Sequence, residues 1–327
     1  MKKKILVTRK YPLSGIDLLE KEGFELTQWP KERPMTAEEL IQEAKAHDAV
    51  LCTVTDRVDA DFLAANSHLD IISQYAVGYD NIDVAAATKL NIPVGHTPGV
   101  LTQATADIAF GLMIAVARKM VFAHKKIIRG NWGFFNPVGD LGIELKGKTL
   151  GIFGLGRIGM EMAHLCQGAY GMKVIYHNRS QNAEAEKEFG AVKVSFEGLL
   201  AQSDILSVHC NLSAETSEIF NKAAFGQMKP TAVFINTARG GIHQETDLIR
   251  ALETGEIWGA GLDVTSPEPM DKDNPLLEME NVCVLPHIGS ATLEARSAMS
   301  DLAAVNLIEF YKTGCVPYIV NPEVLAE

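Results

Sequence analysis

The sequence predicts an α/β protein with two doubly wound parallel sheets, and three observations lead to that fold class. Short apolar, β-branched segments alternate with helix-like segments along almost the whole chain, an order typical of parallel sheets covered by helices. The alternation occurs in two separate series. The length of 327 residues also exceeds what one ordinary domain needs.

The first series predicts short strands at 5–8, 24–27, 49–53, 71–74 and 93–95. A helix is expected at 36–46, because Thr36 with Glu39 three residues later forms a capping-box pattern. A long helical segment is expected at 101–129. It is apolar on most of its faces, which predicts burial at a domain or subunit interface.

The second series predicts strands at 148–153, 173–177, 205–208, 233–236, 259–263 and 282–285. A last helix, at about 292–313, follows the end of this series. We expect it to return to the first domain. The predicted domains are therefore 1–100 with 290–327, and 101–289, with a cleft between them.

The sequence G-L-G-R-I-G at 154–159 lies between a strand-like and a helix-like segment, which makes it a dinucleotide-binding fingerprint of a Rossmann-like domain. Gly154 allows a tight turn, and Gly156 lets the backbone approach a pyrophosphate. Gly159 lets the helix pack closely on the strand. The start of the helix offers free N–H groups and a positive dipole end to the phosphates.

The end of the next strand bears on which dinucleotide is bound. A site selective for NAD usually has an Asp or Glu about 20 residues after the glycines, to accept hydrogen bonds from the ribose. This chain has Asn178, Arg179 and Ser180 there, which can all bond a phosphate. The residues therefore favour NADP(H). If Arg179 is only a solvated turn residue, either NADP(H) or NAD(H) would serve.

The composition excludes several classes of partner. The net charge of −11 argues against nucleic acid and anionic membranes. No segment approaches the length of a membrane span, and no signal peptide is evident. The five cysteines are scattered and the histidines lack metal-ligand spacing, so we expect reduced thiols, no metal and a cytoplasmic location.

Three loops that follow predicted strands contribute Arg239, Glu268 and His287 at the edge where open α/β sheets bind ligands. Arg239 can hold the carboxylate of a 2-oxo acid bidentately, and His287 can exchange a proton with the developing alkoxide. Glu268 can orient the ring and raise its pKa. Taken one at a time, Arg239 could bond a helix end, Glu268 could lie in a solvated turn and His287 could be a polar residue of the core. Together, beside a dinucleotide fingerprint, they predict hydride exchange at a carbon that bears oxygen.

Four motifs in order resemble the D-isomer-specific 2-hydroxyacid dehydrogenase family. They are G-L-G-R-I-G, N-T-A-R-G at 236–240, D-V-x-x-x-E-P at 263–269 and P-H-I-G-S at 286–290. The resemblance spans essentially the whole chain and is closest to the glyoxylate/hydroxypyruvate reductase and 2-ketogluconate reductase branch.

This resemblance implies roles for particular residues. Arg239 would anchor the substrate, His287 would donate and accept the proton, and Glu268 would be its partner. The backbone amides of Val77 and Gly78 would hold the substrate carboxylate. The cofactor would be contacted by Thr105, Arg157, Ile158, Cys210, Thr237, Ala238 and, at the nicotinamide end, Asp263.

The residues alone leave alternatives for two of these assignments. Gly78 could belong to a plain strand-ending turn, and Asp263 could brace its own loop.

The aromatic segment 130–137 could reach a neighbouring subunit or pack within the chain. The resemblance also implies a homodimer.

The predicted function is a reductase that transfers hydride from NADPH to a small 2-oxo acid, giving the D-2-hydroxy acid. Glyoxylate, hydroxypyruvate and 2-ketogluconate are the leading substrates, with 1–100 and 290–327 as the substrate-binding domain and 101–289 as the dinucleotide-binding domain. The alternatives are an NAD-dependent oxidation such as that of 3-phosphoglycerate, and a dinucleotide-responsive corepressor-like scaffold.

Overall fold

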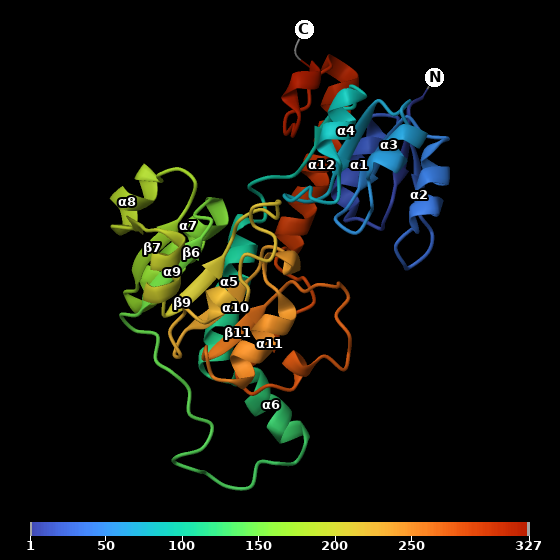
Figure 1. The fold of residues 1–327 in the computed structure, drawn as a ribbon. Coiled ribbons are helices and arrows are strands. Elements are labelled where there is room, and N and C mark those ends of the chain that lie inside the picture. Colours follow the sequence, from blue (N-terminus) through green and yellow to red (C-terminus); the bar gives the residue numbers. More distant parts are fainter. Residues whose placement is uncertain (1, 326–327) are drawn as a thin grey trace. The chain divides into compact units, whose positions relative to one another are not determined.

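The computed structural model describes residues 2–325, which form two compact units. The second unit is Thr102–Ser290, and the first contains the described residues on either side of it. Each unit is a parallel sheet with helices on both faces (Figure 1). The predicted α/β fold class is confirmed.

The first unit is built on a sheet of five strands in the order β2-β1-β3-β4-β5, in which every neighbouring pair is parallel. The strands are β1 (Lys4–Val7), β2 (Glu25–Gln28), β3 (Ala49–Cys52), β4 (Ile71–Gln74) and β5 (Val94–Gly95). The helices are α1 (Leu13–Lys21), α2 (Ala37–Ala44), α3 (Ala60–Ala65), α4 (Val84–Lys89) and α12 (Leu293–Thr313), with η3 at Pro322–Leu325.

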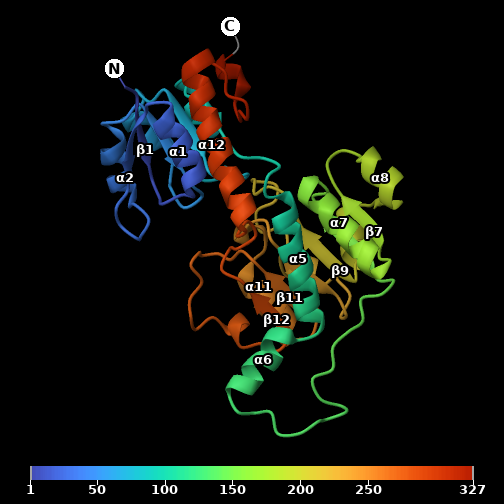
Figure 2. The same cartoon turned by 180° about the vertical axis from the view of Figure 1, so that it is seen from behind.

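Two apolar clusters cover the two faces of this sheet. Helices α1 and α12 pack on one face, and α2, α3 and α4 pack on the other. Figure 2 shows α1 and α12 side by side. Gly15 permits this close approach, because a Cβ there would overlap the carbonyl group of Ser300. The predicted capping box also forms, with Thr36 and Glu39 each bonding the other's backbone N–H.

The second unit is built on seven parallel strands in the order β12-β11-β10-β9-β6-β7-β8. They are β6 (Thr149–Phe153), β7 (Lys173–His177), β8 (Val192–Lys193), β9 (Ile205–Val208), β10 (Val233–Asn236), β11 (Gly259–Leu262) and β12 (Val282–Val284). The strand order reverses at β6, which lies between β7 and β9. Open α/β sheets bind ligands at the carboxyl ends of the strands beside such a reversal.

Helices cover both faces of this second sheet (Figures 1 and 2). On one face lie α5 (Thr102–Ala117), α7 (Arg157–Tyr170) and α8 (Ala183–Phe189), and on the other lie α9 (Phe196–Gln202), α10 (Lys222–Phe225) and α11 (Glu245–Glu253). Short η1 (Gly240–Ile242) and η2 (Pro275–Leu277) lie in the late loops. Val233 and Ile235 join one apolar cluster and Phe234 joins the other, as expected for a strand buried on both faces.

The segment 101–129 differs from its prediction as one buried helix. It forms α5 and α6 (Met120–Ile128), because Lys119 takes a left-handed conformation with φ 49° between them. Eight residues of α5 are buried, but none of α6 is. The expected burial therefore holds for α5 alone.

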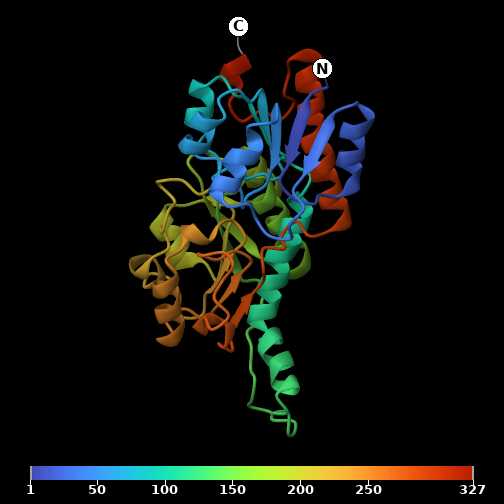
Figure 3. The ribbon, with the colours of Figure 1, turned by 90° about the vertical axis from the view of Figure 1, so that its right-hand side faces the viewer.

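Helix α6 and residues 129–142 form an extension of the second unit, which we call the arm (Figure 3). Val121 and Phe122 of the arm are half-buried. Eight other large apolar side chains of the arm are exposed, and they are Met120, Ile127, Ile128, Trp132, Phe134, Phe135, Val138 and Leu141. The aromatic segment 130–137 therefore does not pack into a core of the chain.

Candidate active site

The three glycines after β6 have the three different environments that the fingerprint predicts. Gly154 has a φ of +94°, and a Cβ there would lie 2.6 Å from the backbone N of Cys210. Gly156 faces open space, with no atom within 4 Å of the position a Cβ would take. Gly159 is packed, since its Cβ would lie 3.0 Å from Ile152 Cγ2. The turn therefore leaves room for a pyrophosphate at Gly156 alone.

The first turn of α7 is open to a ligand. The N-cap residue is Gly156, which has no side chain to cap the helix, so the first N–H groups are left for another acceptor. Arg157 is exposed and Ile158 is half-buried. Beside the turn, burial raises the pKa of the Cys210 thiol to about 12, so that side chain is neutral.

The end of β7 differs in part from the predicted phosphate site. Asn178 Oδ1 accepts a hydrogen bond from Leu155 N at 2.6 Å, and its Nδ2 donates to Leu155 O at 3.2 Å. This amide thus braces the glycine turn, whereas Arg179 and Ser180 are exposed. Sequence reasoning missed Lys193, whose Nζ donates to Arg179 O at 3.3 Å from the edge strand β8.

Asp263, after β11, braces the loop that carries His287. Its Oδ1 accepts from Ile288 N and its Oδ2 from Gly289 N, both at 2.7 Å, and its carbonyl accepts from His287 N at 2.9 Å. Burial raises the pKa of the Asp263 carboxyl, against the lowering effect of these two N–H donors. The structure therefore shows a bracing contact to the His287 loop, whereas the alternative left open by the sequence was that Asp263 braces its own loop.

His287 and Glu268 form a hydrogen-bonded pair. Nδ1 of His287 lies 2.8 Å from Glu268 Oε2, and Glu268 Oε1 accepts from Thr265 N at 3.0 Å. Both side chains remain about a third exposed, at 35% and 36%. Within residues 2–325, no protein group bonds the other ring nitrogen, Nε2, which leaves it for a reactant.

The pKa of Glu268 lies below its ordinary value. Burial alone would raise this pKa. The opposing effects are larger, and they come from the hydrogen bond and charge of His287, the Thr265 N–H and the charge of Arg239. The carboxylate is therefore ionised near neutral pH, and it is available as a hydrogen-bond acceptor for Nδ1 of His287.

Asn236, buried at the end of β10, sets the loop that carries Arg239. Its Oδ1 accepts from Ala238 N at 2.9 Å, and its Nδ2 donates to Arg239 O at 2.8 Å. The same Nδ2 lies 3.1 Å from Nδ1 of His243. Burial lowers the pKa of His243 to about 4, so its neutral Nδ1 can accept this bond.

Gly240 joins the Arg239 loop to the Glu268 loop. A Cβ at Gly240 would overlap the carbonyl of Thr265, so only glycine allows the two backbones to approach so closely. The Nη1 of Arg239 donates to Ala238 O at 2.7 Å. Arg239, Glu268 and His287, predicted separately on three loops, are thus brought together in one unit.

Other predicted cofactor residues surround this edge of the sheet. Thr105 Oγ1 donates to Gly289 O at 3.2 Å and ties α5 to the His287 loop. Thr237 Oγ1 lies 3.5 Å from Nδ1 of His209. Burial lowers the pKa of His209 to about 4, so this ring, which sequence reasoning left without a role, is neutral.

In the first unit, Val77 and Gly78 lie in the turn after β4. The Val77 carbonyl lies 2.9 Å from Nδ1 of His96, and the Gly78 carbonyl accepts from Gln74 Nε2 at 3.2 Å. Both residues are half-buried. Their backbone N–H groups have no acceptor among the described residues.

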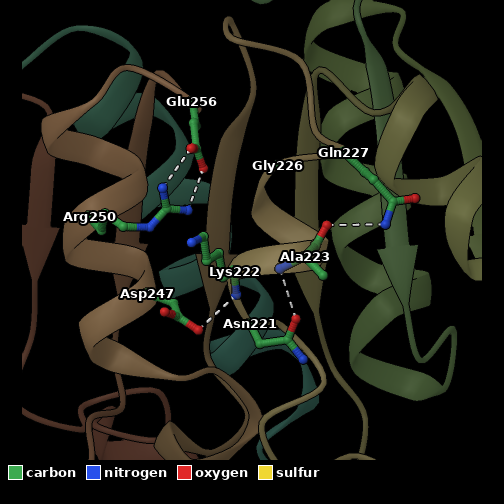
Figure 4. A pocket seen from close by; sticks show the side chains of 8 residues that line it. All are labelled: Asn221, Lys222, Ala223, Gly226, Gln227, Asp247, Arg250 and Glu256. Atoms are coloured by element: carbon green, nitrogen blue, oxygen red, sulfur yellow. Dashed lines mark hydrogen bonds and ion pairs between the residues drawn. The ribbon is translucent and has the colours of Figure 1, made fainter.

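A separate hollow of about 580 Å³ lies on the second unit, between α10 and α11 (Figure 4). Three of its four charged side chains have partners. Arg250 pairs with Glu256 at 2.8 Å, and Asp247 accepts from Lys222 N at 2.8 Å. None of the predicted site residues lines it, so this hollow is separate from the candidate active site.

Residues 2–325 hold neither a metal-ligand cluster nor a membrane-spanning helix. No cluster of three or more His, Cys, Asp or Glu side chains is arranged to hold a metal ion. No helix in this part of the chain has both the length and the apolar character that crossing a membrane requires.

Comparison with known proteins decides the family. The NAD binding domain of D-isomer specific 2-hydroxyacid dehydrogenases matches residues 110–289. The chain is 46% identical to the glyoxylate reductase of Thermococcus litoralis over 99% of this chain and 98% of the relative. It is 43% identical to the glyoxylate reductase of Korarchaeum cryptofilum, again over 99% and 98%.

This chain belongs to the D-isomer-specific 2-hydroxyacid dehydrogenase family. The resemblance seen in its motifs is confirmed. It is an NAD(P)-dependent enzyme that interconverts 2-oxo and 2-hydroxy acids, and its cofactor is a nicotinamide dinucleotide.

Solved structures agree with this family. A glyoxylate reductase from Paecilomyes thermophila has a TM-score of 0.87 and 33% identity, over 98% of this chain and 99% of that one. An NADPH-dependent glyoxylate/hydroxypyruvate reductase from Sinorhizobium meliloti, in complex with NADP and malonate, has a TM-score of 0.84 and 31% identity, over 98% and 97%.

Proposed function

We propose that this dehydrogenase works as an NADPH-preferring reductase of glyoxylate and similarly small 2-oxo acids. The product is the 2-hydroxy acid, in the D configuration where its second carbon is a stereocentre. The observation that carries the proposal is the His287–Glu268 pair beside Arg239, at the carboxyl edge of a sheet whose glycine turn fits a dinucleotide. Relatives named glyoxylate reductase support this substrate.

The nicotinamide, when bound, supplies the hydride to the carbonyl carbon of the substrate. Arg239 binds the substrate carboxylate through its guanidinium. As charge develops on the carbonyl oxygen, Nε2 of His287 donates the proton that converts it to a hydroxyl group. Glu268 holds Nδ1 of the same ring and stabilises the imidazolium that exists before the transfer.

We assign a second contact with the substrate carboxylate to the backbone N–H groups of Val77 and Gly78. The N–H groups of both residues have no acceptor among residues 2–325, so they are available to an anion. Hydrogen bonds to a charged acceptor are roughly twice as strong as those between neutral groups. These groups bind a carboxylate, which is most of what a small 2-oxo acid needs. The additional hydroxyl groups of 2-ketogluconate would need further partners, so small acids are favoured.

The preference for NADPH is assigned to the turn after β7. Arg179 and Ser180 are exposed there, Lys193 lies against Arg179 O, and the turn holds no carboxylate at 178–180. Thr105, Arg157, Ile158, Cys210, Thr237, Ala238 and Asp263 are assigned to the rest of the cofactor. Asn178 is assigned to the glycine turn and not to the phosphate.

The test is steady-state oxidation of NADPH and NADH in parallel, with glyoxylate, hydroxypyruvate and 2-ketogluconate. We expect the highest kcat/KM with NADPH and glyoxylate or hydroxypyruvate. A clear advantage for NADH would contradict the role of Arg179. No turnover with any pair would contradict the reductase and favour a dinucleotide-responsive scaffold.

A single substitution separates the cofactor assignment from the reaction. Arg179→Ala should raise the KM for NADPH about tenfold or more and leave the KM for NADH unchanged, because the lost contact is with the phosphate that NADH lacks. Lys173→Ala, at the opposite end of β7, removes the same charge from an exposed position and serves as the control. Equal changes for both cofactors would refute the assignment.

We also propose that the protein is a homodimer, with the arm in the contact. Eight large apolar side chains are exposed over this one extension. Contiguous apolar surface of this kind marks protein–protein interfaces. A cytoplasmic location completes the proposal and suits five cysteines that are all free thiols.

A further inference from the structure

The turn after β4 is held through its carbonyl groups by residues that follow β5. Thr97 N donates to Ala76 O at 2.9 Å, and Nδ1 of His96 lies 2.9 Å from Val77 O. A carbonyl oxygen only accepts hydrogen bonds, so Nδ1 of His96 must carry the hydrogen. Two successive peptide groups of the turn are therefore fixed from the same side.

The geometry of a trans peptide converts these contacts into directions for two N–H groups. In such a peptide the C=O of one residue and the N–H of the next point in opposite directions. The bond to Ala76 O therefore directs the Val77 N–H away from Thr97, and the bond to Val77 O directs the Gly78 N–H away from His96. Both N–H groups then face the same side, where one anion can accept a hydrogen bond from each.

The rest of the network makes this arrangement rigid. Gln74 Nε2 donates to Gly78 O at 3.2 Å and to Asn81 Oδ1 at 2.7 Å. These bonds fix the next peptide group, so the turn is held at three carbonyls in succession.

His96 is itself fixed on its backbone and on its ring. Its N–H donates to Tyr318 O at 2.9 Å, and its carbonyl accepts from Asn306 Nδ2 at 3.0 Å. Its ring meets the Tyr79 ring edge-on, with 5.7 Å between centroids. Helix α12, which carries Asn306, thereby supports the position of the His96 imidazole.

We propose that His96 is a positioning residue for substrate binding, whose Nδ1–H holds Val77 O and so presents the Gly78 N–H, together with that of Val77, to the carboxylate of the substrate. This role rests on the proposed function, since it presupposes that the two N–H groups bind that carboxylate. His96 touches neither the reacting carbonyl nor the cofactor in this role. It acts only through the direction of a peptide group.

A pair of substitutions separates the hydrogen bond from the ring. In His96→Asn the Nδ2 amide can replace Nδ1 as the donor, whereas His96→Leu keeps bulk and loses the donor. His96→Leu should raise the KM for glyoxylate about tenfold with kcat within about twofold, because carboxylate binding is the same in the ground state and the transition state. For His96→Asn, both the KM for glyoxylate and kcat should stay within about twofold of the wild-type values.

Binding of oxalate, a dicarboxylate that cannot be reduced, measures the same contact without turnover. Calorimetry with the NADP-loaded enzyme should show about tenfold weaker binding to His96→Leu and near wild-type binding to His96→Asn. Asn66→Ala is the matched control, because Asn66 is a buried amide of the same unit whose Nδ2 bonds Phe62 O at the end of α3. Asn66→Ala should lower the stability of the protein without changing the KM for glyoxylate or the Kd for oxalate.

The outcomes distinguish this role from the proposed function. Equal loss of oxalate affinity in both His96 variants, or no loss in His96→Leu, would overturn the positioning role even if glyoxylate is reduced. No binding of oxalate to the wild type would overturn the carboxylate contact itself. Oxalate binding with the expected pattern, but no reduction of any 2-oxo acid, would overturn the reaction and leave the role of His96 intact.

Discussion

A half-buried carboxylate such as that of Glu268 would ordinarily keep its proton more tightly than in water, because burial disfavours the charged form. Here His287, the Thr265 N–H and Arg239 outweigh burial and bring the pKa of Glu268 below its ordinary value. The carboxylate is therefore charged throughout the range in which an imidazole titrates. At the scale of single residues, this charge makes His287 a suitable proton donor.

Removing the proton donor should abolish most of the turnover. His287→Gln keeps polarity and approximate size but cannot donate a proton from a cationic ring, so kcat/KM should fall by about 10²–10⁴. The Kd for NADPH, measured by fluorescence titration, should stay within about twofold. Turnover close to the wild type would contradict the assignment of His287.

Replacing its partner should lower the rate and leave cofactor binding unchanged. Glu268→Gln keeps the approximate size of the side chain but removes the carboxylate that Nδ1 of His287 meets at 2.8 Å, so kcat/KM should fall by about tenfold or more. The Kd for NADPH should stay within about twofold. Glu253→Gln, at an exposed carboxylate on α11, should leave kcat/KM unchanged; an equal fall in both variants would point to overall charge instead.

At the scale of an element, the turn from β6 into α7 shows how one motif divides its tasks among three glycines. Gly154 serves the backbone conformation, Gly159 serves packing and Gly156 leaves open space, which we assign to the ligand. The first two tasks contribute to the stability of the fold. The third contributes only when a dinucleotide is bound.

Two alanine substitutions in this turn should therefore have opposite effects. Gly154→Ala combines a φ of +94° with a clash against Cys210, and should lower the free energy of unfolding by about 1–3 kcal/mol or more. Gly156→Ala meets no protein atom, so thermal unfolding of the apo protein should shift by only a few degrees. Its Kd for NADPH should rise at least tenfold, because the methyl group occupies the space of the pyrophosphate. Unchanged affinity in Gly156→Ala would place the cofactor elsewhere.

At the scale of the whole molecule, the arm is the feature that the chain does not cover. None of the residues of α6 is buried, although the segment is apolar enough to predict burial. The apolar side chains of α6 that stay exposed are expected to pack on another chain. The assembly state therefore depends on this extension.

Polar substitutions on the arm test that dependence. Phe134→Ser together with Phe135→Ser should shift the mass measured by analytical ultracentrifugation from a dimer toward a monomer. Leu13→Ser removes a comparably exposed apolar side chain from α1 and should leave the mass unchanged. A wild type that sediments as a monomer would refute the homodimer.

The sequence by itself was sufficient for features that depend on neighbouring residues. The predicted strands agree with the structure to within one residue at each end, except that the two-residue edge strand β8 was missed. The capping box of Thr36 and Glu39 and the different environments of the three glycines could also be predicted, because turn conformation and helix capping are local. Order along the chain was enough to place Arg239, Glu268 and His287 at one edge of the sheet.

Only the tertiary structure decided which distant groups meet. In the folded chain the Asn178 amide is hydrogen-bonded to Leu155, and Lys193 is hydrogen-bonded to the carbonyl of Arg179. The tertiary structure also placed His96 on Val77 O and left α6 exposed. Each of these results joins residues 14–23 positions apart or depends on which surface another part of the chain covers. A side chain takes the partner that packing of the sheets brings within hydrogen-bond distance, and the spacing of residues in one sequence does not specify that distance.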